Sequence, residues 1–581
     1  MSFLSSLIVV IFSAILLSLG IPNEIFHFGN SIMGLICFIP LYYVFFRSNS
    51  KHKTALMYSF FVSLTHLFSS FWLINFQDFA IFTLGASTVA YFVLAYPFGL
   101  FFHYIFKYGN IKHRPFLFAL TITLWEYFKS SGFTAYPWGV ISMTALNLHT
   151  FIQFIDVTGV WGLSYILALI GAMETEVLLA IFGLTDGFKK CKKRPLTIPL
   201  FLTIFLISII NIYGFFALKS HETPTKSISL LLVQQNIDPW YDSMEESLKV
   251  GQRLTRKALK ENENVDLVVW SESSLSRSYE DYKNWYEFIP ENDAFIPFLR
   301  EIKVPILIGT PLKGKEDSSK TYNGVALIDE DGNILQTYSK MQLVPFAEFL
   351  PFIEHPIVKK FFNRLVGFSS GWAQGQMYKL FSLKTKKGDD VFFTTPICYE
   401  DAFPSLCAGL HEKGSDLLIN LTNDSWSKIE SAEYQHFAIA YFRAIEMRTS
   451  LVRSTNGGYT CVINPKGELL GTLPLFEEGT LTIDVPLYSH KTTPYSLFKD
   501  WLPLLLFIIL LLYIWKKQTL YIKKQKETLY YTFHWKKDFN ETFVKSIKLS
   551  DCRKRYAKIS PVSPKIIKLK KGKTPKQTTQ K

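Results

Sequence analysis

The segment Thr394-Thr395-Pro396-Ile397-Cys398-Tyr399-Glu400 is central to the interpretation of this chain, because an apolar, β-branched run ends there at a single cysteine. The run begins at Val391, and we expect a buried strand that stops at Cys398. Polar residues follow and a helix is expected just after them, an environment that lowers the pKa of a thiol. Cys398 is therefore a candidate nucleophile. The alternative is a small buried apolar side chain, which most lone cysteines are.

Two further reactive side chains follow apolar strands upstream. Glu272 comes after the run 265–270, and Lys340 closes the run 334–339. The Glu272 carboxylate is a candidate general base, and the Lys340 ammonium is a candidate fixed charge for an oxyanion. The alternatives are a surface carboxylate and an exposed lysine at a strand end. His436, in an expected helix at 431–448, is interpreted as a packing or hydrogen-bonding residue. Together, the thiol of Cys398, the carboxylate of Glu272 and the ammonium of Lys340 at the ends of expected strands predict acyl transfer through a thioester.

Residues 221–490 have the composition of a soluble domain in which strands alternate with helices, which predicts an α/β fold. Hairpins are expected at 323–340 and 458–473, because Asp331-Gly332 and Asn464–Gly467 are turn sequences between apolar runs. These hairpins predict mixed rather than purely parallel sheets. Further helices are expected at 243–262, 285–302 and 402–413.

Residues 1–220 are nearly continuous apolar blocks. Spans of about 20 apolar residues cross a bilayer as helices. Eight are expected, at 2–20, 28–46, 55–75, 82–106, 115–130, 158–183, 197–218 and 497–515. The first lacks a basic start and an A-x-A-like site, which favours an uncleaved helix over a signal peptide. The expected parts are thus a seven-helix membrane domain (1–220), a catalytic domain (221–490), an eighth helix (491–515) and a tail (516–581).

Loop charges predict the orientation of the helices. Lys and Arg are concentrated in loops 47–54, 107–114 and 184–196, whereas loops 21–27, 76–81 and 131–157 have none. Because basic loops stay in the cytoplasm, residues 219–496 are expected on the outer side and both termini inside.

The excess of positive charge belongs to the tail. Residues 516–581 contain 20 Lys and Arg and 4 Asp and Glu, a net charge of +16, while the whole chain carries +14. The tail is expected to be disordered and to favour anionic lipids. Nucleic-acid binding by the folded part has no electrostatic support. The six cysteines are scattered, and no C-x-x-C pair, P-loop or dinucleotide fingerprint is present, so no metal or cofactor is expected.

Two features of the membrane part have competing interpretations. Glutamates in spans are functional candidates by default, but Glu126, Glu174 and Glu176 lie near span ends, which favours a structural role over transport. The loop 131–157 is rich in aromatic residues and is interpreted as an aromatic belt at the membrane interface, with a lipid-contacting lip as the alternative. Its aromatic residues are Phe133, Tyr136, Trp138, Phe151 and Phe154.

Taken together, these motifs resemble a known family. Trp270–Glu272, Tyr338–Lys340 and Ile397–Glu400 resemble the Glu-Lys-Cys triad of the nitrilase superfamily. Lys340–Pro351 (Lys-Met-Gln-Leu-Val-Pro-Phe-Ala-Glu-Phe-Leu-Pro) is similar to the K-x-x-L-V-P-F-G-E-x-x-P segment of its apolipoprotein N-acyltransferase branch. Later motifs of that branch are matched by Asn423–Trp426, Arg443–Glu446 and Arg453–Asn456. The resemblance covers about 1–515. Two residues depart from it, Ser271 in place of proline and Ala347 in place of glycine.

The resemblance implies a nitrilase-like αββα sandwich inserted between the seventh and eighth membrane helices of a bacterial inner-membrane protein. It implies that Cys398 takes a fatty acyl chain from a phospholipid and passes it to the N-terminal amine of diacylglyceryl-cysteine in an apolipoprotein. Glu272 would accept protons and Lys340 would stabilise the oxyanion. The resemblance also implies supporting roles for Glu348, Tyr399 and Glu400, and substrate contact by Trp240.

Two other classes of protein share part of this pattern. A membrane-tethered nitrilase-type amidase would have the same triad but would need only one anchor, whereas seven helices precede this domain. A transporter would show paired charges within its spans and no triad outside them.

Overall fold

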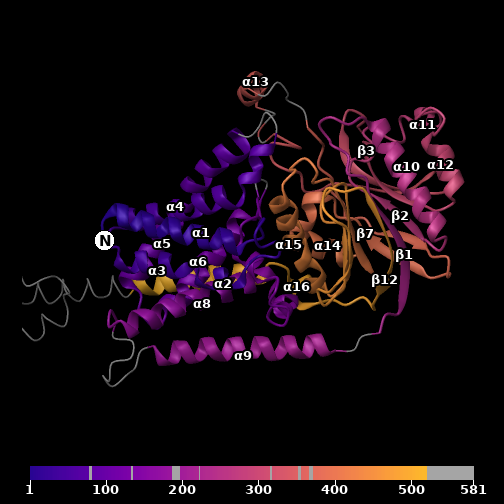
Figure 1. The fold of residues 1–581 in the computed structure, drawn as a ribbon. Coiled ribbons are helices and arrows are strands. Elements are labelled where there is room, and N and C mark those ends of the chain that lie inside the picture. Colours follow the sequence, from indigo (N-terminus) through magenta and orange to yellow (C-terminus); the bar gives the residue numbers. More distant parts are fainter. Residues whose placement is uncertain are drawn as a thin grey trace, which may run out of the picture. The chain divides into compact units, whose positions relative to one another are not determined.

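The computed structural model describes residues 1–76, 81–132, 135–185, 196–220, 223–314, 317–350, 352, 355–365 and 371–519. Residues Met1–Phe507 form one unit, and the residues from Ile508 onward form a second. Within the first unit, a helical part up to Lys219 is followed by a two-sheet sandwich (Figure 1). Most of the basic loop 184–196 and the tail beyond Thr519 lie outside the described residues.

Helices occupy each of the eight ranges expected to span a membrane. They are α1 (Phe3–Gly20), α2 (Ser31–Ile36) with α3 (Phe38–Arg47), α4 (Lys51–Ser69), α5 (Ser87–Tyr108), α6 (Arg114–Lys129), α8 (Val160–Ile181), α9 (Thr197–Lys219) and Trp501–Thr519. Five helices among the described residues are long and apolar enough to cross a bilayer, namely α1, Thr83–Tyr108, α8, α9 and Trp501–Thr519. Since α6 is 16 residues long and α4 begins with Lys51-His52-Lys53, a total of eight stays a prediction.

The second expected span is two helices rather than one. The break between α2 and α3 falls at Cys37. Pro40 lies in the first turn of α3, where backbone N–H groups have no partner within the helix. Its missing N–H therefore costs nothing there, whereas in the middle of one long helix it would remove a hydrogen bond.

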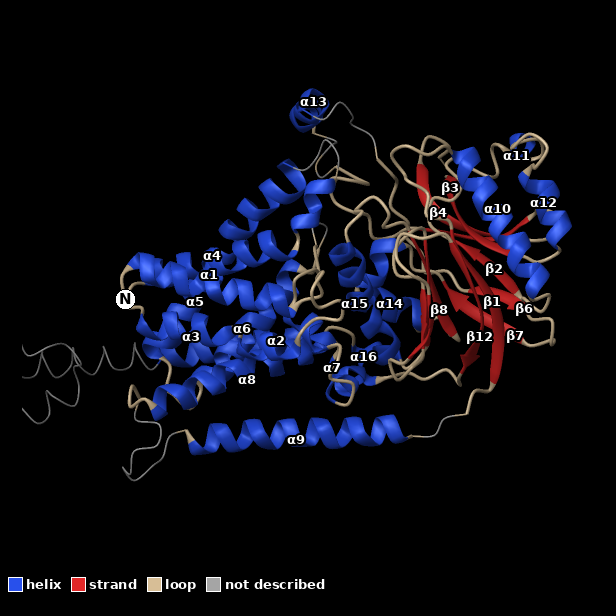
Figure 2. Ribbon diagram, viewed as in Figure 1, coloured by secondary structure: helices blue, strands red, loops and turns tan. Residues whose placement is uncertain are grey.

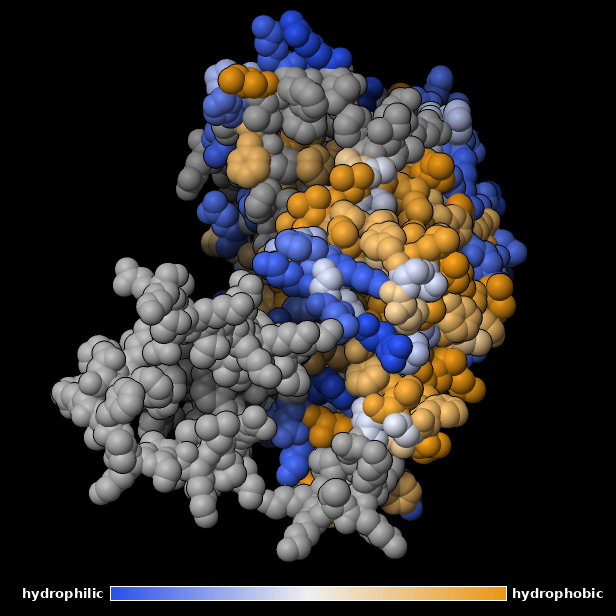
Figure 3. Space-filling view, turned by 90° about the vertical axis from the view of Figure 1, so that its left-hand side faces the viewer, coloured by the Kyte–Doolittle hydropathy of each residue, from blue (hydrophilic) through white to orange (hydrophobic). Residues whose placement is uncertain are grey.

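The apolar surface expected of a membrane protein is present on the helical part. Figure 3 shows a broad hydrophobic face on the end of the molecule where the N-terminus lies. Along α9, large apolar side chains point outward, including Ile198, Phe201, Ile204, Phe205 and Phe216. A helix this apolar needs a lipid environment around it.

The polar groups inside the helical part join helix ends. The buried Glu176 carboxylate accepts hydrogen bonds from Arg114 Nε at 2.6 Å and from Tyr42 OH at 2.5 Å. Glu126 accepts a hydrogen bond from the backbone N–H of Ile141 at 2.7 Å. Arg114 is the first residue of α6, so this ion pair ties helix termini together. Such fixed pairing is consistent with the structural role expected for Glu126 and Glu176.

The sandwich consists of two six-stranded sheets. The first has the strand order β12-β1-β2-β3-β4-β5 and the second β11-β10-β9-β8-β7-β6. In the first sheet, β1–β2 and β2–β3 are parallel and the other pairs antiparallel; in the second, β7–β8 and β8–β9 are parallel. The strands are β1 (Lys226–Gln234), β2 (Leu267–Trp270), β3 (Ile306–Lys313), β4 (Thr321–Ile328), β5 (Ile334–Ser339), β6 (Phe381–Lys384), β7 (Asp390–Thr394), β8 (Leu417–Thr422), β9 (Ser450–Thr455), β10 (Cys461–Ile463), β11 (Leu469–Thr472) and β12 (Gly479–Leu487).

Apolar side chains of both sheets meet in one core, which includes Leu230, Val269, Val391, Ile419 and Val452. On the outer face of the first sheet lie α10 (Met244–Glu261), α11 (Lys283–Tyr286) and α12 (Phe295–Ile302) (Figure 2). The second sheet is covered by α14 (Pro404–His411) and α15 (Glu430–Met447), on the side toward the helical part. The layers are therefore αββα. Both expected hairpins and the mixed sheets are confirmed.

Two expected elements are shorter than predicted. The strand leading to Cys398 ends at Thr394, and Ile397 makes only an isolated bridge to Leu421. The reason is Pro396, which has no N–H to donate to a ladder. The helix expected at 285–302 is likewise two pieces, α11 and α12, because Pro290 lies between them.

Burial in the protein contradicts both the interfacial belt and the lipid-contacting lip for three aromatic residues of the loop 131–157. Trp138, Phe151 and Phe154 are all buried in the protein. Trp138 stacks on Tyr399 of the sandwich, with ring centroids 5.5 Å apart and planes 11° apart. Phe133 lies outside the described residues. An apolar loop predicts burial, but not whether lipid or protein covers it.

Candidate active site

Cys398 begins a 3₁₀ turn (η5, Cys398–Ala402) after the extended residues that follow β7. Its backbone is left-handed, with φ of +47°, and its side chain is half-buried. A non-glycine residue in this region is strained by about 1–3 kcal/mol, and the surrounding structure must hold it there. Asn420 does so in part, since its Nδ2 donates to the carbonyls of Pro396 and Cys398, each at 3.1 Å. The chain has thus left the ladder of β7, which ends at Thr394, before it reaches the residue that bears the thiol.

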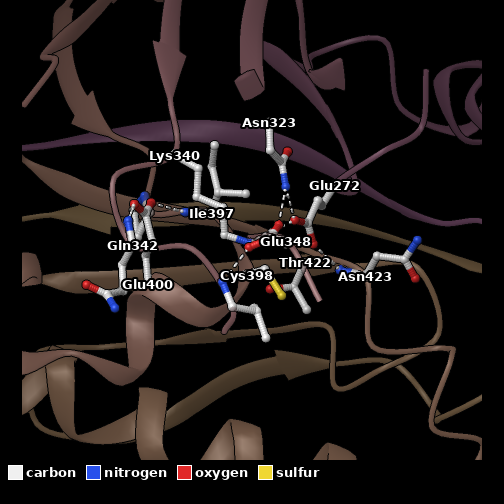
Figure 4. Close-up of polar contacts among 12 residues, drawn as sticks. Glu272, Asn323, Lys340, Gln342, Glu348, Ile397, Cys398, Glu400, Thr422 and Asn423 are labelled. Atoms are coloured by element: carbon white, nitrogen blue, oxygen red, sulfur yellow. Dashed lines mark hydrogen bonds and ion pairs between the residues drawn. The ribbon is translucent and has the colours of Figure 1, made fainter. Parts of the chain in front are cut away.

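Beside the thiol lies a cluster of charged and amide groups from other segments of the sandwich (Figure 4). Lys340 Nζ is 3.2 Å from Glu272 Oε1 and 2.8 Å from Glu348 Oε1. Asn323 Nδ2 donates to the same two oxygens at 2.8 Å each. The second Glu272 oxygen accepts the Asn423 N–H at 3.0 Å. One buried ammonium and one amide thus hold two carboxylates in place.

Glycine at position 309 allows Glu272 to sit where it does. A Cβ on Gly309, in β3, would lie 2.5 Å from the Ser273 nitrogen and 2.7 Å from the Glu272 Cα. Both are backbone atoms, which cannot yield as a flexible side-chain end could. The close approach of β3 to the turn after β2 therefore requires the absence of a side chain there.

Glu400 joins the segment after β5 to the turn that bears Cys398. One carboxylate oxygen accepts the N–H groups of Met341 at 2.6 Å and Gln342 at 3.0 Å. The other accepts the Ile397 N–H at 2.8 Å, and Tyr338 OH bonds to both oxygens at 3.0 Å. Glu400 is fully buried. It fixes the spacing between the residues next to Lys340 and those next to Cys398, so it is a positioning residue.

Charges and burial decide the resting protonation of the site. Burial and then the negative charge of Glu272 raise the pKa of the Cys398 thiol well above its ordinary value, and the opposing effect of Lys340 is smaller. This direction is opposite to the expected thiolate-favouring environment, because burial and the Glu272 charge together outweigh the Lys340 charge. Burial disfavours the Lys340 ammonium, but Glu272 and Glu348 outweigh it and raise the pKa of Lys340. Both pKa directions favour a neutral thiol and a charged lysine at rest.

Tyr399 and Trp240 occupy different positions relative to the cluster. Tyr399 is buried, donates from its hydroxyl to the Ala135 carbonyl and stacks on Trp138, so it joins the turn that bears Cys398 to the helical part. Trp240 is 38% exposed in the loop after β1, with its ring 6.0 Å from that of Phe76. It is placed at the junction of the two parts rather than among the charged residues.

His436 makes the hydrogen bonds expected of it. Its Nδ1 lies 2.8 Å from Asp424 and its Nε2 2.9 Å from Asp401, while Arg453 pairs with Asp401. Burial disfavours a charged imidazole, but Asp424 and Asp401 outweigh burial and raise its pKa to about 9. Both ring nitrogens face acceptors, so the ring is an imidazolium that joins α15 to η5.

Sequence reasoning did not single out Asn323. The available signal was a polar residue at the start of the apolar run Val325–Ile328, where a strand otherwise buries only apolar side chains. Of the two departures from the family pattern, Ser271 is buried and hydrogen-bonded to Gln235 and Ser274. Ala347 has no left-handed backbone, so the position does not need glycine.

Known protein families match both the helical part and the sandwich of this chain. Residues 231–495 match a family model described as carbon-nitrogen hydrolase, and residues 13–173 match one described as apolipoprotein N-acyltransferase N-terminal domain. The apolipoprotein N-acyltransferase 2 of Treponema denticola is 50% identical over 516 residues, which covers 88% of this chain and 97% of the relative.

More distant relatives carry the same name. Apolipoprotein N-acyltransferase 2 of Treponema pallidum is 44% identical over 86% of this chain and 92% of its own length. The apolipoprotein N-acyltransferase of Borreliella burgdorferi is 31% identical over 84% of this chain and 91% of its own length. The similarity thus spans the helical part and the sandwich together.

Proposed function

The chain belongs to the apolipoprotein N-acyltransferases, enzymes with a carbon-nitrogen hydrolase domain, and on that premise we propose that Cys398 carries the acyl chain as a thioester between a membrane phospholipid and a lipoprotein amine. The observation that carries this proposal is the strained Cys398 thiol beside the bonded Glu272–Lys340 pair. A tethered amidase is disfavoured, because the relatives share the N-terminal helical domain as well as the hydrolase domain.

In the first half-reaction, Cys398 Sγ attacks the ester carbonyl of the phospholipid while Glu272 takes the thiol proton. A neutral thiol needs such a base. The carbonyl oxygen becomes an oxyanion, which the Lys340 ammonium stabilises. The intermediate collapses, the carbon–oxygen ester bond breaks, and the lysophospholipid oxygen leaves with the proton from Glu272. The acyl chain is then bound to Cys398.

In the second half-reaction, the neutral amine of diacylglyceryl-cysteine attacks the thioester carbonyl. Glu272 accepts the N–H proton, the carbon–sulfur bond breaks and an amide forms. The leaving sulfur regains its proton from Glu272, so the enzyme returns to its starting state. An amine that arrives protonated releases one proton to water.

Supporting residues are assigned by what they contact. Glu348 holds Lys340 and accepts the Val344 N–H at 2.8 Å, and Glu400 sets the spacing of the two catalytic segments. Tyr399 anchors the catalytic turn against Trp138. We assign Trp240, exposed at the junction, to substrate contact.

We also propose the arrangement in the membrane. Residues 1–220 form a membrane domain, 221–490 the catalytic domain, 491–515 a last membrane helix, and 516–581 a basic cytoplasmic tail. The catalytic domain lies on the periplasmic side of the inner membrane, where both substrates are anchored. Confinement of both to one plane raises their effective concentration.

The test separates the two half-reactions. Purified enzyme is mixed with phospholipid alone, and intact mass spectrometry is used to find one acyl adduct on Cys398. Addition of a diacylglyceryl lipopeptide should then remove the adduct and acylate the peptide, and double-reciprocal plots for the two substrates should be parallel. Cys398→Ala should form no adduct, whereas Cys461→Ala, which removes a buried thiol in β10, should form it. An adduct on Cys398→Ala would refute the assignment of the nucleophile.

A further inference from the structure

A second cluster of reactive side chains lies away from the active site. Among the described residues, His411, Glu412 and His490 are the one group of three whose ligand atoms lie within 4.8 Å of one another. The two imidazole rings have centroids 4.3 Å apart and planes 28° apart. His411 ends α14, and His490 lies between β12 and α16 (Pro494–Phe498). The cluster therefore joins the helix behind the catalytic turn to the segment that leaves the sandwich.

The hydrogen bonds of the two rings fix which nitrogens are free. His411 Nε2 lies 2.9 Å from the Lys491 carbonyl, and His490 Nδ1 lies 3.1 Å from the Ser415 carbonyl. A carbonyl oxygen can only accept, so these two nitrogens carry the protons. The lone pairs of the neutral rings are then on His411 Nδ1 and His490 Nε2. Metal-binding histidines almost always donate their other N–H in this way, which sets the tautomer and the ring orientation.

The buried nitrogen of His411 is the second, independent observation. His411 is 1% exposed, and its Nδ1 has no hydrogen-bond partner among the described residues. A buried acceptor without a partner is costly and is rarely retained without a role. Stacking on His490 satisfies the ring faces but not this in-plane lone pair.

We propose that His411 Nδ1, His490 Nε2 and a Glu412 carboxylate oxygen bind one Zn²⁺ ion per chain. Two imidazoles and a carboxylate are a ligand set that zinc accepts in tetrahedral geometry, with water in the fourth position. Calcium and magnesium prefer oxygen ligands. The cysteine spacing gave no sign of this site, because its ligands are histidines and Glu412 is 78 residues from His490.

The ion acts on structure rather than on the acyl transfer itself. The cluster is at the end of α14 opposite to the catalytic turn, and that eight-residue helix spans about 12 Å. A metal there ties residues 488–493 to α14, and thus holds the exit of the chain toward Trp501–Thr519 against the helix that follows Cys398. Binding to the folded state alone raises the melting temperature by mass action.

The test uses the full-length enzyme in detergent micelles, purified without a polyhistidine tag. The protein is loaded with ZnCl₂, freed of unbound metal, and its zinc content is measured by inductively coupled plasma mass spectrometry and its affinity by calorimetry. We expect about one zinc per chain and a higher melting temperature that EDTA reverses. His490→Gln removes a ligand and should weaken zinc binding by more than about 10-fold. Even the loss of a group that only hydrogen-bonds to a ligand typically weakens a metal site about 10-fold to 100-fold.

Matched variants decide the outcome. His113→Gln changes an exposed histidine elsewhere and should leave zinc binding unchanged, and Cys398→Ala should do the same, which excludes the catalytic thiol as the ligand. His490 is on the surface, so its replacement is expected to fold and to retain acyl transfer in EDTA. Wild-type protein that retains no zinc, or His490→Gln protein that binds zinc as tightly as wild type, would overturn the proposal.

Discussion

At the level of single residues, the proposed mechanism makes Cys398 depend on Glu272 as its base, because burial and the charge of Glu272 raise the pKa of the thiol. Glu272→Gln preserves the shape of the side chain but cannot accept a proton. We expect the variant to fold and to form the thioester about 10²-fold to 10⁴-fold more slowly, the usual contribution of a general base. The measurement is the growth of the acyl adduct with time by intact mass spectrometry.

The control for this variant is Glu280→Gln, which neutralises an exposed carboxylate downstream of Glu272 and should react at the wild-type rate. A Glu272→Gln enzyme that reacts at the wild-type rate would mean that another group takes the proton.

Glu400 should give the reaction a pH dependence. Burial raises the pKa of its carboxyl to about 7, although the N–H groups of Ile397, Gln342 and Met341 oppose this. Above that pH both oxygens accept hydrogen bonds; below it the proton occupies one oxygen, and one donor loses its acceptor. We expect the rate of thioester formation to fall as the pH drops through about 7. The measurement is the adduct rate between pH 5.5 and 8.5.

Glu400→Gln is the diagnostic variant, because its amide resembles the acid form at every pH. This variant should form the thioester slowly at pH 8, and its rate should not fall as the pH drops through about 7. Its phospholipid binding should stay unchanged. If the rate of the Glu400→Gln variant still falls as the pH drops through about 7, the titrating group lies elsewhere in the site.

At the scale of elements, β3 can approach the turn after β2 only because position 309 is glycine. Gly309→Ala should push the backbone at Glu272 and Ser273 away. We expect a loss of about 1–3 kcal/mol in the free energy of unfolding, typical of overpacking, and a slower acylation of Cys398. Denaturant unfolding and the adduct assay measure the two effects.

The comparison is Gly479→Ala in β12, where an added Cβ meets only the Leu473 side chain at 3.5 Å, an ordinary contact distance. This variant should keep both stability and rate. Equal effects from the two substitutions would show that the close approach at Gly309 has no special importance.

The attachment of α15 to η5 should weaken in alkaline solution. The folded-state pKa of His436 is raised from 6.5 to about 9 by Asp424 and Asp401 against the effect of burial. The imidazolium therefore stabilises the fold fully below pH 6.5, and this contribution is lost as the pH rises through 9. The shift corresponds to on the order of 3 kcal/mol. The melting temperature of the wild type should fall across this range.

His436→Asn should be less stable than the wild type at pH 6 and should lack this part of the pH dependence. Parallel pH profiles for the two proteins would rule out His436 as the group responsible.

At the scale of the whole molecule, the proposed orientation is open to direct measurement. The basic loops 47–54 and 107–114 are expected in the cytoplasm and the catalytic domain outside it. In intact cells, a membrane-impermeant thiol reagent should label Ser319→Cys, an exposed position of the sandwich. It should label Asn49→Cys only after permeabilisation. The reverse pattern would invert the topology.

The helical part and the sandwich share buried contacts, so the two are not independent modules. Gln435 of α15 donates to the carbonyls of Pro22 and Ser69, each at 2.9 Å, and accepts a hydrogen bond from Trp72 Nε1 at 3.2 Å. Tyr495 packs against Gly159, where a Cβ would meet the ring at 2.4 Å. These contacts hold the sandwich, and with it the turn that bears Cys398, against the apolar helices.

The local features of this protein follow from its amino-acid sequence alone. The hairpins at Asp331-Gly332 and Asn464–Gly467 were predictable, because turn residues and alternating apolar residues act over a few neighbours. The apolar helices followed from composition in the same way. Glu272, Lys340 and Cys398 were proposed as reactive residues from their strand-end positions and the family motifs around them, and the structure brings them together.

Which distant side chains meet depends instead on how the whole chain packs. Asn323 bridges Glu272 and Glu348, Glu400 accepts the N–H groups of residues about 60 positions away, and His411 meets His490. No periodic pattern in the sequence predicts these contacts, because they arise from the strand order β2-β3-β4-β5 and from the packing of the second sheet on the first. The same holds for Trp138, because apolarity shows that a side chain avoids water, whereas the packed fold decides whether protein or lipid covers it.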